Sequence, residues 1–216
     1  MHKFWAMVSK DLLLEARQKD LWLVMLAFAL LDLFLAAFSF GSMARSAAPG
    51  ILWMAFLYAG MLSIGRGFTR ESDDGTLLGI SLAPGGRWPV FWAKLAGAFL
   101  ALLAMEGILV PLYLVLFGLG LDRLSVAFLA VLVLGAVGVA SVGILMAAIS
   151  MNIGGHDAVM PVLLMPLLVP VAILSVKASM ALWVHQSATF WIRGLGAVDA
   201  IFLALPLLAF EYLWEG

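Results

Sequence analysis

The stretch SVAFLAVLVLGAVGVASVGILMAAI, residues 125–149, decides the fold class, because it contains no charged side chain. A helix of about 20 apolar residues crosses the roughly 30 Å of hydrocarbon in a bilayer. Backbone polar groups in lipid must be satisfied within the segment, and the stretch lacks the alternation of a barrel strand. A membrane-spanning α-helix is therefore predicted. Small residues at helical spacing would allow close packing, within the chain or with a second copy: Gly135, Ala136, Gly138, Ala140 and Gly143.

The rest of the chain is also rich in apolar residues. Of its 216 residues, 65% are hydrophobic and only 12% are charged, where a soluble domain has about a quarter. Five further segments are long enough to span: 21–44, 50–66, 94–118, 158–177 and 190–213. The shortest is 50–66. The sequence predicts an all-α integral membrane protein, with six transmembrane helices in a single domain over residues 1–216.

Composition also excludes several functions. Twelve Lys and Arg residues against thirteen Asp and Glu give no basic field for nucleic acid. The absence of cysteine excludes disulfides and thiolate metal sites. Tryptophans, which favour the headgroup region, fall near the expected span ends: Trp22, Trp53, Trp88, Trp92, Trp183, Trp191 and Trp214.

Residues 1–20 have a different pattern. Trp5, Val8, Leu12 and Ala16 recur at helical spacing, and the basic residues lie largely off this stripe. We expect an amphipathic helix lying flat on the membrane surface, with an ordinary soluble amphipathic turn as the alternative.

Orientation follows from the distribution of Lys and Arg. If the N-terminus is cytoplasmic, eight of these residues belong to the cytoplasmic side and four to the other side. The first half of the chain decides this result. We therefore expect residues 68–93 to be cytoplasmic and residues 178–190 to be extracytoplasmic.

A polar stretch at residues 68–84, FTRESDDGTLLGISLAP, interrupts this apolar chain. Asp73-Asp74-Gly75 has the composition of a turn, and Thr76 is a suitable N-cap. Leu77, Leu78, Ile80 and Leu82 would then give a short helix an apolar face, which suits a groove in a cytoplasmic partner. A solvated loop whose leucines fold back onto the membrane is the alternative.

Several stretches, in order along nearly the whole chain, resemble the haem exporter protein B (CcmB) family of ABC-2-type permeases in cytochrome c maturation. They are KDLLLEARQKD (10–20), FALLDLFLAAFSF (28–40), APGILWMAFLYAGMLSIGRGFTRE (48–71), ESDDGTLLGISLAPGGRWPVFWAKLAG (71–97), LLMPLLVP (163–170) and AVDAIFLALPLLAFEYLWE (197–215). The resemblance implies a coupling helix that docks into an ATPase subunit. The corresponding residues here are Glu71, Asp74, Gly75, Thr76, Leu77, Leu78, Leu82 and Pro84.

Two positions depart from the family pattern. Leu78 stands where the family usually has glutamate, and NIGGHDAV (152–159) lacks an arginine often found there. The first departure removes a charged side chain from the expected contact with the ATPase and puts the polar part of that contact in doubt.

The resemblance also implies partners in a bacterial cytoplasmic membrane: a cytoplasmic ABC ATPase, a second copy of this chain, a haem-handling membrane subunit and a haem chaperone. The sequence contains no G-x-x-x-x-G-K-[ST] motif and no hydrolytic triad, so we expect a permease without catalytic activity, with ATP held on the partner. Haem would be cargo. Whether the cycle moves haem or releases a loaded chaperone stays open, as does a generic exporter of lipid or polysaccharide.

Three further residues merit attention. Asp32 and Glu106 lie near the centres of the first and third spans and should face the protein interior or water. We interpret them as protonated or hydrogen-bonded packing residues; a proton relay, as in a proton-coupled secondary transporter, is the alternative. His185, beside Met180 and Trp183, is the candidate axial haem ligand, with a solvated loop histidine as the default.

Overall fold

A computed structural model describes residues 19–73, 88–150 and 156–212. This part of the chain is almost entirely helical, with six long helices: α2 (Lys19–Phe40), α3 (Ala44–Asp73), α5 (Trp88–Leu116), α6 (Val126–Ser150), α7 (His156–Trp183) and α8 (Thr189–Tyr212). Two short 3-10 turns, Gly41–Met43 and Leu121–Arg123, connect α2 to α3 and α5 to α6. The predicted all-α membrane class is confirmed. The expected surface helix at residues 1–20 lies almost entirely outside the described residues.

Four of these helices contain described stretches that are long and apolar enough to cross a membrane: Trp22–Phe40, Trp92–Leu116, Val126–Met146 and Leu164–Trp183. The order of the six long helices follows that of the predicted spans.

Several helices differ in length from the predicted spans, most clearly α3 and α7. The span at 50–66 belongs to the longest helix, α3, which has 30 residues. The span at 158–177 belongs to α7, which continues to Trp183. The flanks of α3 are polar and retain helical hydrogen bonds, whereas the added residues of α7, 178–183, are mostly apolar and continue the same span.

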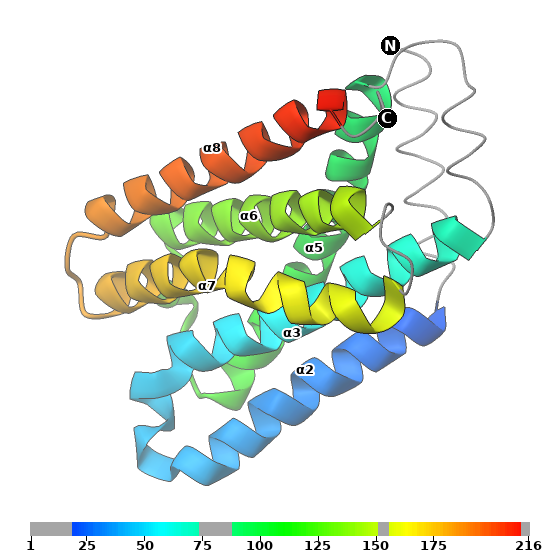
Figure 1. Cartoon of the computed structure of the whole chain (residues 1–216). Coiled ribbons are helices and arrows are strands. Elements are labelled where there is room, and N and C mark those ends of the chain that lie inside the picture. Colours follow the sequence, from blue (N-terminus) through cyan, green and yellow to red (C-terminus); the bar gives the residue numbers. More distant parts are fainter. Residues whose placement is uncertain (1–18, 74–87, 151–155, 213–216) are drawn as a thin grey trace.

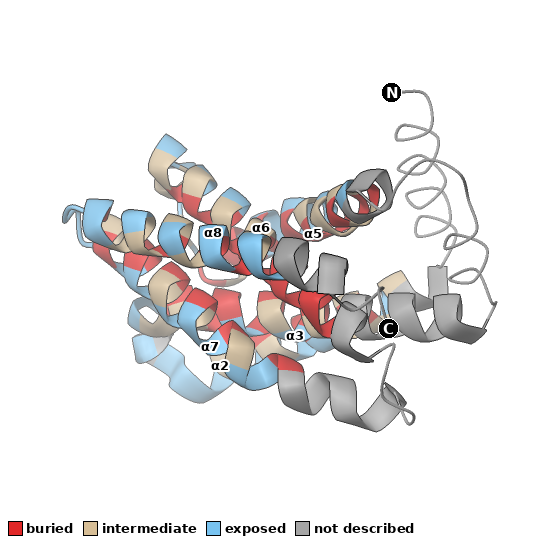
Figure 2. Cartoon of the chain, turned by 45° about the horizontal axis from the view of Figure 1, so that its top comes forward, coloured by how far each residue is buried: buried red, intermediate tan, exposed pale blue. Residues whose placement is uncertain are grey.

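The bundle is centred on α6. This helix packs against α5, α7 and α8 and also contacts α3, while α2 lies at the edge beside α3 and α5. Figure 1 shows α8, α6, α7, α3 and α2 following one another, with α5 on the far side. Buried residues face the spaces between these helices, and much of α2 is exposed (Figure 2).

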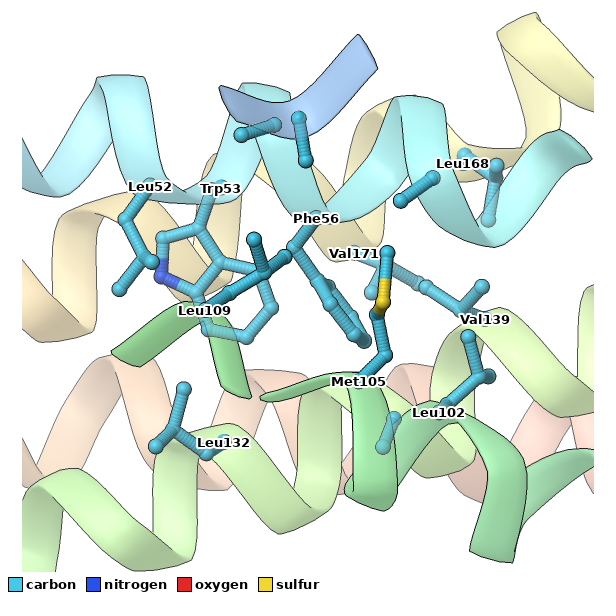
Figure 3. Close-up of a cluster of buried hydrophobic side chains, with 14 of the residues drawn as sticks. Leu52, Trp53, Phe56, Leu102, Met105, Leu109, Leu132, Val139, Leu168 and Val171 are labelled. Atoms are coloured by element: carbon cyan, nitrogen blue, oxygen red, sulfur yellow. The ribbon is translucent and has the colours of Figure 1, made fainter. Parts of the chain in front are cut away.

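The buried side chains labelled in Figure 3 belong to α3, α5, α6 and α7. Trp53 and Phe56 of α3 pack edge to face, with ring centroids 5.6 Å apart. Trp53 is only 1% exposed, so its ring packs inside the bundle. Its indole Nε1 donates a hydrogen bond to Ser179 of α7, so the ring faces a neighbouring helix.

Three helix connections meet at one end of the bundle, which we call the short-loop end: residues 41–43, 117–125 and 184–188. The Arg45 guanidinium lies 3.2 Å from the position of a Cβ atom added to Gly118, which places the first two connections side by side. Arg123 Nη1 donates a hydrogen bond to the Trp183 carbonyl at 2.8 Å, which joins the second connection to the end of α7.

Candidate functional site

Three acidic side chains lie inside the helical bundle, on α2, α5 and α8. Asp32 precedes the end of α2 by eight residues, Glu106 precedes the end of α5 by ten, and Asp199 follows the start of α8 by ten. At 1.5 Å per residue, each lies about 12–15 Å along its helix from the short-loop end. The three carboxyl groups therefore occupy a similar depth.

The two acids expected from the sequence differ in burial. Glu106 is 5% exposed, and its Oε1 has no hydrogen-bond partner among the described residues. Asp32 is half-buried, and its Oδ2 is buried without a described partner. Both face protein, as expected for acids in a membrane span. Their role as packing groups or proton carriers stays a prediction.

Sequence reasoning missed Asp199 as a site residue. Asp199 is 3% exposed, and neither carboxyl oxygen has a described hydrogen-bond partner. Its Oδ1 lies 2.6 Å from the position of a Cβ atom added to Gly138 of α6, so the carboxyl fits beside this glycine only because no side chain is present there. The available signal was an acid well inside the last apolar segment, the same signal that identified Asp32 and Glu106.

A polar stripe lies on the inner face of α7. Ser175 and Ser179 are fully buried, and Ser179 Oγ accepts a hydrogen bond from Trp53 Nε1 at 2.9 Å. Ser175 Oγ and Trp183 Nε1 are buried without described partners. Because these residues are four apart along the helix, they share one face. Hydropathy alone gave no indication of this stripe.

Aromatic and basic groups hold the short-loop end of α7. The Arg123 guanidinium lies 5.7 Å from the Trp183 ring centroid, in addition to its bond to the Trp183 carbonyl. The Trp183 ring centroid also lies 6.0 Å from that of Tyr113 on α5. A cation at the C-terminal end of a helix also interacts favourably with its carbonyl groups. Arg123 therefore ties the α5–α6 connection to α7.

His185 follows α7 in the short connection to α8. It is exposed and has a positive φ of 55°, which is uncommon for a residue other than glycine. Its N–H donates to Leu182 O at 3.2 Å, and the Gln186 N–H donates to Ala181 O at 2.8 Å. These two bonds form a Schellman cap, so the position of His185 has a structural explanation.

A haem-ligand role for His185 stays a prediction, because the described residues do not identify a second haem ligand next to it. Among the described residues, no group of three or more His, Asp or Glu side chains could hold a metal ion.

Helix α3 extends six residues into the stretch 68–84 that the sequence predicted as a cytoplasmic coupling loop. Residues 68–73 are the last turns of α3 instead of a loop, so Glu71 lies in a helix. Polar residues continue the helix because its backbone hydrogen bonds do not require a hydrocarbon surrounding. The other expected coupling residues lie outside the described ranges: Asp74, Gly75, Thr76, Leu77, Leu78, Leu82 and Pro84.

Comparison with known proteins covers nearly all of this chain. The family model described as CcmB protein matches residues 2–212. Heme exporter protein B of Bradyrhizobium diazoefficiens is 29% identical over 209 residues, which represent 94% of this chain and 90% of that protein. A family match over this length, on an all-helical membrane bundle, shows that the chain belongs to the CcmB protein family.

Proposed function

We propose that the chain is the membrane subunit of an ABC transporter that couples ATP hydrolysis on a separate subunit to haem delivery, or to haem-chaperone release, in cytochrome c maturation. The family match over residues 2–212 is the observation that carries this proposal. The related protein from Bradyrhizobium diazoefficiens has the name heme exporter protein B, which supports haem as the cargo.

The energy source must lie outside this chain. The sequence contains no phosphate-binding loop of the P-loop type, and the described residues form a helical bundle with an apolar core. We propose a cytoplasmic ATPase partner that docks at the end opposite to the short-loop end, where α3 leads into residues 74–87 and α6 into residues 151–155. Two copies of the chain would face two ATPase subunits.

The charge distribution supports the matching orientation in a bacterial cytoplasmic membrane. Eight Lys and Arg residues belong to the proposed cytoplasmic side. The other four lie within about two helical turns of the short-loop end in the structure: Arg45, Arg123, Lys177 and Arg193. We therefore propose that the short-loop end is extracytoplasmic and that the N-terminus is cytoplasmic.

Purification of the tagged protein in mild detergent tests the proposal. We expect an ATPase and a haem-handling membrane protein to co-purify. An ATPase alone would favour a generic ABC-2 exporter of lipid or polysaccharide. Recovery of neither would favour a proton-coupled secondary transporter, for which the intramembrane acids Asp32 and Glu106 are the candidate carriers.

A matched pair of variants locates the docking site. Leu78→Arg should lose the ATPase, because a groove that receives an apolar helix would bury an unpaired charge at a cost of several kcal/mol. Leu121→Arg makes the same change at a leucine that is 77% exposed at the short-loop end, and should retain the ATPase. Retention by both variants would contradict docking through residues 76–83.

A further inference from the structure

We propose that water molecules occupy a buried polar path on the inner face of α7, which leads from Trp183 at the short-loop end past Ser179 and Ser175 to Asp199. This path is independent of the nature of the cargo and of the ATPase partner. Its ligand is water, hydrogen-bonded to side chains that the helices leave without partners.

The unpaired polar atoms are the first evidence. Ser175 Oγ, Trp183 Nε1 and both carboxyl oxygens of Asp199 are buried and have no hydrogen-bond partner among the described residues. A buried polar group without a partner costs about 1–3 kcal/mol, and ordered water normally supplies the missing bond. Four such atoms along one route require more than one isolated water.

A comparison of two serines sharpens this point. Ser141 on α6 is fully buried and donates to the Val137 carbonyl, four residues earlier in its own helix, at 2.6 Å. Ser175 is equally buried, yet its hydroxyl is not satisfied in this way. A hydroxyl that does not bond to its own helix is available to a molecule lying beside that helix.

Gly138 connects the stripe on α7 to the acid on α8. A Cβ atom added to this glycine would lie 2.6 Å from Asp199 Oδ1 and 2.9 Å from Val171 Cγ1. The carboxyl therefore lies beside Val171, which is one turn before Ser175 on the same face of α7. Trp183, Ser179, Ser175 and Asp199 thus follow one another from the short-loop end inward.

Among the described residues, no basic side chain forms an ion pair with Asp199 that could take the place of water. The sequence of α6 contains no charged residue, and Lys177 of α7 and Arg193 of α8 are exposed. Tyr113 of α5 contributes another buried hydroxyl without a described partner near Trp183, where the path meets the short-loop end.

Single cysteines test the path, since the chain contains none of its own. Ser175→Cys places a thiol in the path, and Ala29→Cys and Leu33→Cys place one at equally buried control positions on α2, which packs against α3 and α5. The protein in lipid nanodiscs is treated with a small water-soluble methanethiosulfonate, and the mixed disulfide is measured by mass spectrometry. Only a hydrated thiolate reacts, so we expect Ser175→Cys to react at least about tenfold faster than both controls.

Equal rates at all three positions would overturn the proposal, whether they are uniformly slow or uniformly fast. Thermal melting checks that each variant is folded. If Ser175→Cys does not fold, Ser179→Cys provides the same comparison one turn nearer the short-loop end, and a rate no higher than that of the controls would overturn the path there as well.

Discussion

Helices α6 and α2 are both long, apolar membrane helices, yet they occupy opposite positions in the bundle. In the most apolar stretch of α6, 72% of the residues are buried, against 17% in the corresponding stretch of α2. Hydrophobicity therefore places a helix in the membrane without deciding whether it faces lipid or protein. Small residues on α6 allow the close contacts that accompany its central position.

Two glycines of α6 leave room for neighbouring side chains. Gly135 lies against the Trp53 ring of α3, and Gly138 lies against Asp199 of α8 and Val171 of α7. Within-chain packing therefore explains these two glycines. In α2, by contrast, large side chains point outward: Leu23, Phe28, Leu31, Phe34, Leu35 and Phe38.

The strongest test of this contrast compares one phenylalanine on each helix. Phe128 of α6 is 1% exposed, and Phe38 of α2 is 83% exposed. Phe128→Ala should lower the free energy of unfolding by about 3 kcal/mol, because it removes packing contacts from the core. This is the lower end of the usual range for Phe→Ala, since in a membrane the separated helices keep the side chain in lipid instead of water. Phe38→Ala should change it by no more than about 0.5 kcal/mol. Unfolding of both variants in mixed micelles measures the difference, and equal losses would break the contrast.

A smaller effect is expected when a methyl group is added at the glycines. A Cβ atom at Gly135 would overlap the buried Trp53 ring, so Gly135→Ala should destabilise the protein by about 1–3 kcal/mol. Gly107 of α5 has nothing within 4 Å of its added Cβ atom. Gly107→Ala should instead stabilise by about 0.5–1 kcal/mol, because alanine is the better helix former. Melting temperatures in detergent should therefore shift in opposite directions.

The smallest effects are expected for two neutral replacements of the acids, one on the peripheral helix and one on a buried helix face. Asp32→Asn and Glu106→Gln keep shape and hydrogen bonding while removing ionisation. If both acids are packing groups, the yield of mature cytochrome c should stay within about twofold of the parent. A loss for Glu106→Gln alone, with normal expression and assembly, would assign a proton-carrying role to the buried acid.

The sequence predicted the membrane class and the order of the helices, because apolar length is a local property. It could not predict that Trp53 is buried, since its partner Ser179 lies on α7, 126 residues away along the chain. Asp32 and Glu106 were identified from their place in apolar segments, and Asp199 could have been found in the same way. The polar stripe on α7 required the structure, because a serine in an apolar helix has the same sequence signal whether its hydroxyl bonds to its own backbone, as Ser141 does, or stays free.

The fit of Asp199 beside Gly138 also bears on how the chain assembles during synthesis. Helix α8 is the last of the described helices to be made, and an acid at the centre of a membrane helix costs about 2.5–3.5 kcal/mol on insertion scales. By then α6, with its space beside Gly138, and α7, with its polar stripe, are already synthesised. Since a shift of one residue turns an α-helical side chain by about 100°, only one register of α8 brings the carboxyl to that space. A register that left the carboxyl in lipid would carry this cost, so the position of Asp199 favours the register of α8 seen in the structure.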